Sequence, residues 1–200
     1  MDKQIKAEKA WEIPYKVYKE LGKFDIDFLS NVPLEKYKEL FENGRYHRFN
    51  DKSAIEFYEA IHKIKEDYGG DASKIWSGSP SSATVVYRFL EFKGIGIKIA
   101  TMATNILARN LKIEMSDYYS VDISPDRHVI RVIKRLGYVD EDATRDQIIY
   151  KAREINPEFP GIIDLACFKI GREYCHPQNP NCASCSLNKE CVYCRSFYHD

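Results

Sequence analysis

The feature that most constrains this chain is a cluster of cysteines near its end, because five of its six cysteines lie between residues 175 and 194. Four of them follow the spacing C-x6-C-x2-C-x5-C: Cys175, Cys182, Cys185 and Cys191. The residues between them, such as HPQNPN and SLNKE, offer too few apolar side chains to fold by burial alone. Four thiolates at this density are typical of a metal centre, whose binding then supplies the folding free energy. The sequence therefore predicts a metal-binding loop here, and not an ordinary helix.

Spacing alone leaves two kinds of centre open. The pairs Cys182-x2-Cys185 and Cys191-x2-Cys194 are also of the kind found in tetrahedral zinc sites. The sixth cysteine, Cys167, lies in the apolar segment GIIDLACFKIG, and we expect it to be a small buried core residue.

The rest of the chain has the composition of a globular protein. Of its 200 residues, 44% are hydrophobic, enough for one compact domain or two small lobes. No apolar stretch reaches the length of a membrane span, and the N-terminus lacks the apolar region of a signal peptide. We therefore expect a cytoplasmic protein without a membrane partner, where the cysteines stay reduced.

Apolar residues repeat at helical spacing almost throughout, which predicts an all-α protein. Pro33 marks the start of one helix, and Gly69-Gly70 mark the end of another. On the first helix we expect Trp11 to anchor the core. The expected helices cover residues 8–21, 33–43, 51–69, 81–92, 96–111, 126–137 and 142–155.

Charge gives only local hints of a nucleic-acid partner. Thirty basic residues balance thirty acidic ones, so the whole chain lacks a strongly basic character. The richest basic run is DRHVIRVIKRLG, with Arg127, Arg131, Lys134 and Arg135, although such a run is also typical of a solvated helix face.

The segment FLEFKGIGIKIATMATNIL predicts a helix, a tight glycine turn and a second helix. Gly94 and Gly96 permit the turn and let backbone N–H groups approach a phosphate. An ordinary helix–helix connection has the same pattern, but no strand precedes the glycines, which argues against a dinucleotide-binding loop.

These motifs, in this order, resemble the helix-hairpin-helix DNA glycosylases of the endonuclease III type, a base-excision-repair superfamily. The cysteine spacing resembles their iron–sulfur loop, which implies a 4Fe-4S cluster on the four spaced cysteines and leaves Cys194 as a spare thiol. The hairpin resembles theirs too, with Lys93 where a proline is usual, so that a cation lies near the expected phosphate.

The resemblance also implies the site residues. Lys98 occupies the position of the lysine that forms a Schiff base, and Asp126 occupies that of the catalytic aspartate, followed here by x-His-Val-x-Arg. Taken by itself, Asp126 is the N-cap of a basic helix. The connection between the two residues is longer than the resemblance predicts. Asp122 is a rival carboxylate without the same continuation, and Tyr118 and Tyr119 are candidates for a base pocket or for packing.

At the start of the chain, Gln4 resembles, over a short match, the glutamine that fills the space left by an extruded base. Together with the hairpin residues Lys93, Gly94 and Gly96, and with Arg127, it makes up the expected DNA-binding set.

The implied fold is all-α and two-lobed, with DNA bound in the cleft between the lobes. A helical barrel would span residues 12–115, and an iron–sulfur lobe would combine residues 1–11 and 116–200, with the cluster loop at 175–191.

The implied function is removal of a damaged or mismatched base from double-stranded DNA by a monomer, with lyase activity at the resulting abasic site. Two alternatives stay open: a glycosylase without lyase activity, in which Asp126 activates water, and a non-catalytic iron–sulfur protein that senses damage.

Overall fold

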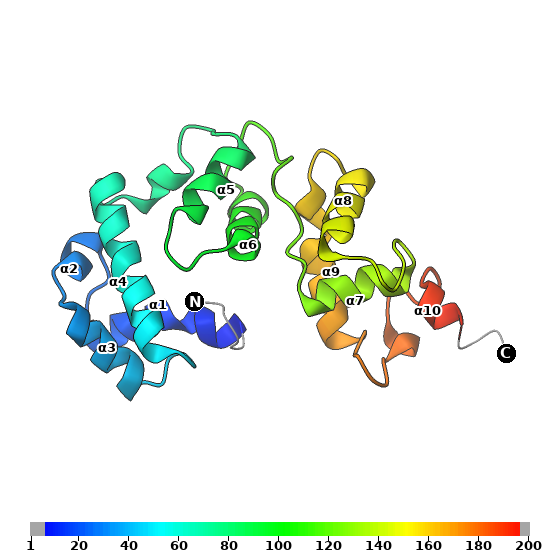
Figure 1. Ribbon diagram of the computed structural model, residues 1–200, viewed down its shortest axis with the longest axis horizontal. Coiled ribbons are helices and arrows are strands. Elements are labelled where there is room, and N and C mark those ends of the chain that lie inside the picture. Colours follow the sequence, from blue (N-terminus) through cyan, green and yellow to red (C-terminus); the bar gives the residue numbers. More distant parts are fainter. Residues whose placement is uncertain (1–6, 197–200) are drawn as a thin grey trace. The chain divides into compact units, whose positions relative to one another are not determined.

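The structure is a computed structural model, and it describes residues 7–196. Within that range it contains helices and no strands, as the apolar spacing predicts (Figure 1). The α-helices are α1 (Ala7–Leu21), α2 (Ile26–Ser30), α3 (Leu34–Asn43), α4 (Asn50–Asp67), α5 (Ser82–Leu90), α6 (Ile97–Arg109), α7 (Arg127–Leu136), α8 (Arg145–Ile155), α9 (Asp164–Glu173) and α10 (Val192–Arg195). Short 3-10 turns lie at η1 (Ala72–Ile75), η2 (Pro160–Ile163) and η3 (Cys182–Ser184). No helix within these limits has the length and apolar character needed to cross a membrane.

Several helix ends follow directly from the sequence. Pro33 precedes α3, and after α4 both Gly69 and Gly70 adopt positive φ angles, of 61° and 81°. Thr144 and Gln147 form a reciprocal capping box at the start of α8. Gly137 ends α7 with a φ of 84°, in the left-handed region that favours glycine.

Contacts divide the described residues into two compact units. The first runs up to Gly78 and includes Tyr87–Gly96, and the second consists of Ser79–Val86 and the chain from Ile97 onward. These units are defined by contacts, whereas the predicted lobes are defined by the expected DNA cleft between them. The predicted boundaries, residues 12–115 for one lobe and residues 1–11 with 116–200 for the other, therefore stay a prediction.

Aromatic rings form the core of the first unit, which contains α1 to α4. Tyr37 and Phe41 of α3 pack on Phe57 of α4, with ring centroids 5.4 and 5.9 Å apart. The Tyr37 hydroxyl donates to the Leu29 carbonyl of α2 at 2.8 Å, so its polar end is satisfied inside the core.

The prediction for Trp11 is wrong. Its side chain is 58% exposed, whereas Ala10, Ile13 and Val17 form the buried stripe of α1. Counting apolar residues identified the helix but not the face that it buries.

The core of the second unit lies between α7 and α9, which are in contact and cross each other in Figure 1. Val129, Val132 and Ile133 of α7 are buried there with Ile148 of α8 and Cys167 of α9. Cys167 is thus the core residue that the sequence predicts, and burial raises the pKa of its thiol to about 12.

Gly171 permits the close approach of α9 to α7. A Cβ added there would lie 2.6 Å from the His128 Cβ and 3.0 Å from its backbone, so the two helices would have to separate. We therefore expect Gly171→Ala to lower the free energy of unfolding by about 1–3 kcal/mol, measured by urea unfolding. Gly96→Ala is the control, because its added Cβ meets nothing within 4 Å. Equal stabilities of the two variants would contradict this account of the packing.

Candidate active site and cysteine loop

Asp126 is held at the start of α7 as its N-cap. Its Oδ1 accepts the backbone N–H groups of His128 and Val129, at 2.8 and 2.9 Å. The capping role predicted for this residue is therefore confirmed, and the cap fixes the direction of the carboxylate. Both capping bonds use Oδ1, so the cap does not use the second oxygen, Oδ2.

Lys98 lies in the first turn of α6 and is half-buried. Ser124 connects this turn to Asp126. The Ser124 Oγ is 3.4 Å from the Lys98 carbonyl oxygen, and the Ser124 carbonyl accepts the Asp126 N–H at 2.6 Å. One residue thus ties the backbone of Asp126 to the backbone of Lys98, within a single unit of the structure.

A second carboxylate, Asp164, supports Ser124 from the start of α9. Its Oδ1 accepts the Ser124 N–H at 2.9 Å, and the side chain is only 9% exposed. The pKa of Asp164 is raised to about 6, mainly by burial and also by the charge of Asp126, against the opposing effects of its bonding to Ser124 and of the charge of Arg109. A buried carboxylate with so high a pKa is a marker of a candidate functional site.

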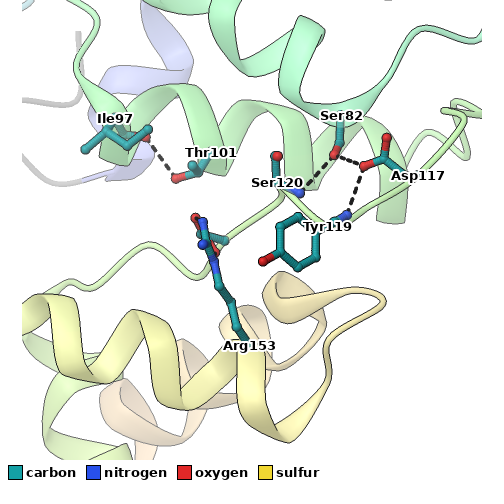
Figure 2. Close-up of polar contacts among 8 residues, drawn as sticks. Ser82, Ile97, Thr101, Asp117, Tyr119, Ser120 and Arg153 are labelled. Atoms are coloured by element: carbon teal, nitrogen blue, oxygen red, sulfur yellow. Dashed lines mark hydrogen bonds and ion pairs between the residues drawn. The ribbon is translucent and has the colours of Figure 1, made fainter.

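The long connection between Lys98 and Asp126 is held by hydrogen bonds at several points, and Figure 2 shows those around Asp117. The Asp117 carboxylate accepts the Ser82 hydroxyl at 2.5 Å and the Tyr119 N–H at 3.1 Å, and Ser82 in turn accepts the Ser120 N–H at 2.9 Å. Further along, the Gly161 N–H donates to the Val121 carbonyl at 2.6 Å. The additional residues therefore do not leave Asp126 on a loose loop.

Asp122, the rival carboxylate, is occupied by Arg153 of α8. The Arg153 Nε and Nη2 bind the two Asp122 oxygens at 2.8 Å each, and this bond raises the pKa of Arg153. The ring of Tyr119, seen near Arg153 in Figure 2, lies 5.3 Å from the guanidinium, and the ring of Tyr150 lies 4.9 Å from it. Such a bidentate pair gives Asp122 an anchoring role, which supports the lower rank that the sequence gives it.

The two tyrosines of this connection have different environments. Tyr118 stacks on Phe159 with ring centroids 5.0 Å apart, so it packs against its own unit, whereas Tyr119 is 51% exposed. Of the two, Tyr119 keeps a surface that a ligand can reach.

The predicted hairpin lies at Glu91–Gly96, between α5 and α6. Gly94 has a φ of 81°, in the left-handed region that favours glycine, and an added Cβ would lie 2.3 Å from the Glu56 carboxyl carbon, so that side chain would have to move. Gly96 is exposed. Lys93 pairs with Glu59 of α4 at 2.6 Å, so the cation that replaces the usual proline already has a carboxylate partner.

Two arginines of the basic run on α7, Arg131 and Arg135, bind the start of the cysteine loop. The Arg131 Nε donates to the Cys175 carbonyl at 2.6 Å, and Arg135 donates to the His176 carbonyl at 2.7 Å and to the Cys175 Sγ at 3.3 Å. Lys134 donates to the Glu141 carbonyl at 2.5 Å. Only Arg127 remains exposed near Asp126, with its Nε 3.4 Å from the His128 ring. Gln4 lies outside the described residues.

The cysteine loop packs on α7 and α9 and contains only two short elements, η3 and α10. This agrees with the prediction that the loop is not an ordinary helix. The cavity that it encloses is lined by all five cysteines of the loop: Cys175, Cys182, Cys185, Cys191 and Cys194. None of them forms a disulfide. Between residues 7 and 196, no three His, Cys, Asp or Glu side chains come close enough together to hold a single metal ion.

With this geometry established, the chain can be compared with known proteins. No family model matches it. Over 164 residues it is 26% identical to endonuclease III of Thermotoga maritima, an alignment that covers 82% of this chain and 65% of that protein. The chain thus spans less than two thirds of that relative's length.

Solved structures show the likeness in fold. A trapped endonuclease III–DNA covalent intermediate matches 99% of this chain and 82% of its own, with a TM-score of 0.66 and 19% identity. A thermostable thymine-DNA glycosylase matches 91% of this chain and 76% of its own, with a TM-score of 0.64 and 17% identity. The chain therefore has the fold of these endonuclease III and DNA glycosylase structures.

Within this endonuclease III fold, the residues that the sequence did not identify are those that support the site. Asp164 lies 40 residues from Ser124 along the chain, and Arg153 lies 31 residues from Asp122, so each pair meets only after folding. One signal was present: Asp164 is a lone carboxylate in the apolar run GIIDLACF, where an unpaired charge is costly to bury.

The raised pKa of Asp164 predicts a stability effect that depends on pH. Because its folded pKa of about 6 exceeds the ordinary 3.8, ionised Asp164 lowers the free energy of unfolding as pH rises from 4 to 6. Asp164→Asn keeps an acceptor oxygen and removes the buried charge. We therefore expect it to raise the free energy of unfolding at pH 7.5 by up to about 3 kcal/mol, and by much less at pH 4.5. Urea unfolding at both pH values measures this, and a loss of stability that is equal at both would contradict it.

Proposed function

We propose that the protein is a base-excision-repair DNA glycosylase with lyase activity at abasic sites, acting as a monomer in the cytoplasm on double-stranded DNA. The observation that carries the proposal is the backbone connection through Ser124, which ties the Lys98 turn of α6 to the capped Asp126 of α7. Support comes from the order of the motifs and from the likeness to endonuclease III.

The proposed reaction begins when one damaged nucleotide leaves the duplex stack, which costs a few kcal/mol and costs least at damaged or mismatched bases. Lys98, in its neutral form, attacks the sugar C1′ through Nζ. The C1′–N bond to the base breaks, and the bond electrons leave with the base, which takes up a proton.

Asp126 opposes the positive charge that develops on the sugar, because its carboxylate is fixed by the cap before the substrate binds. Ring opening then gives an imine between C1′ and Nζ. Loss of a proton from C2′ expels the 3′ phosphate, which nicks the strand. Backbone N–H groups of the hairpin at Gly94 and Gly96, together with Arg127, would bind phosphates.

Variants of the two residues test this assignment. We expect Lys98→Ala to abolish borohydride trapping on DNA with one abasic site while binding persists, because one lost cation weakens binding only modestly. We expect Asp126→Asn, which can still cap α7, to slow base release about a hundredfold or more. Rates come from single-turnover assays on duplexes that each carry one lesion.

The outcomes separate the rival functions. Base release without trapping in wild-type protein would favour a glycosylase in which Asp126 activates water. Tight binding to damaged DNA without either activity would favour a non-catalytic sensor. Full trapping by Lys98→Ala would show that another amine is the nucleophile.

We also propose that the loop holds a 4Fe-4S cluster through Cys175, Cys182, Cys185 and Cys191. Their side chains line one cavity, and the α7 arginines bind the loop carbonyls around it. When bound, the cluster would supply folding free energy to a loop that is poor in apolar groups.

Cysteine variants test the ligand set. We expect Cys185→Ser to lose iron and the broad absorption near ~400 nm that is typical of thiolate-bound clusters. Cys194→Ser should keep both, although Cys194 lines the same cavity. Iron and zinc analysis of protein purified without air measures the difference. Stoichiometric zinc in colourless wild-type protein would refute the cluster.

A further inference from the structure

We propose that Asp164 is a positioning residue for the proposed reaction. Its buried carboxylate holds Ser124, and through Ser124 it sets the backbone of Asp126 against the turn of α6 that carries Lys98. The inference rests on the proposed function and assigns a role to a residue that the reaction described above does not use.

Asp164 is connected to both Lys98 and Asp126 through Ser124. Ser124 is 4% exposed, and its N–H donates to the Asp164 carboxylate at 2.9 Å. Two bonds of Ser124 then lead to the site, from its hydroxyl to the Lys98 carbonyl and from its carbonyl to the Asp126 N–H. A shift of Asp164 therefore moves Asp126 relative to Lys98, although Asp164 itself touches neither the base nor the sugar in the proposed reaction.

The ionised form of Asp164 makes the stronger bond. A hydrogen bond to a carboxylate is roughly twice as strong as one between neutral groups. The Ser124 N–H donates to the Asp164 carboxylate, and the Ser124 hydroxyl lies within reach of the Lys98 carbonyl. Protonation of Asp164 weakens the first of these bonds, so Ser124 is held less firmly between α6 and α7.

The charged and titratable groups around Asp164 come from three elements. Arg109 at the end of α6 carries opposite charge, and its buried Nη1 has no hydrogen-bond partner among the described residues. Asp126 at the start of α7 carries like charge, and Cys167 lies on the same helix, α9, with its thiol held neutral by burial. Among these charged groups, Arg109 alone favours ionised Asp164. Asp122, in contrast, is bound at both oxygens by the Arg153 guanidinium.

This difference provides a matched control. Asp122 and Asp164 are both 9% exposed, and both hold the segment that leads to Asp126. Asp122 is neutralised by Arg153 and supports the fold, whereas the charge of Asp164 opposes folding at neutral pH. A residue whose ionised form destabilises the fold is better explained by a role in the reaction than by one in stability.

The test follows nicking of a duplex with one abasic site under single-turnover conditions from pH 5 to pH 8. For wild-type protein we expect the rate to rise through pH 6 to a plateau. Asp164→Asn should be about tenfold to a hundredfold slower at pH 7.5 and should lack the rise near pH 6, because a small misplacement of reacting groups has a large effect on rate. Asp122→Asn should keep the rise, whatever its plateau rate. Urea unfolding checks that both variants are folded.

Two results would overturn the inference. If folded Asp164→Asn matches wild-type protein in both rate and pH profile, Asp164 has no positioning role, and the proposed function stands without it. If wild-type protein neither nicks nor forms an adduct with abasic DNA at any pH, the proposed function fails, and the role of Asp164 fails with it.

Discussion

The hydrogen bond from the Ser124 N–H to the buried Asp164 carboxylate is the interaction on which the candidate site depends. The segment from Ser116 to Asp126 contains no helix or strand, so its position must come from tertiary contacts. The earlier part of the segment is held by the Asp122–Arg153 ion pair, the bond from Gly161 to Val121 and the bonds of Ser82. Asp164 holds Ser124, just before α7 begins. A connection without regular structure is thereby made rigid enough to present a carboxylate in one direction.

Helix α7 links this site to the cysteine loop. Its first turn is capped by Asp126, and its later turns carry Arg131 and Arg135, which bind carbonyls at the start of the loop. The same helix buries Val129, Val132 and Ile133 against α9. One helix thus connects the backbone at the start of the cysteine loop to the N-cap at Asp126.

The sequence predicted what depends on local spacing, and it missed what depends on contacts between distant residues. Helical periodicity located the long helices, and the cap at Asp126 and the turn at Gly94 followed from residue type. The prediction that Trp11 lies on the buried face of α1 was wrong, because the spacing of apolar residues does not show which face the other helices cover. The partners of Arg131 and Arg135 on α7 could not be predicted, since a basic helix looks the same in sequence whether it faces phosphates or backbone carbonyls. Asp164 was missed because its partner, Ser124, is forty residues away along the chain.

The central claim is that one amine, on Lys98, forms the covalent bond to the sugar. Its most direct test is reduction of the wild-type protein with borohydride on DNA that contains one abasic site, followed by proteolysis and mass spectrometry of the adduct. The account predicts a single modified peptide, with the sugar remnant on Lys98. An adduct on a different lysine or on the N-terminal amine, with Lys98 unmodified, would contradict it.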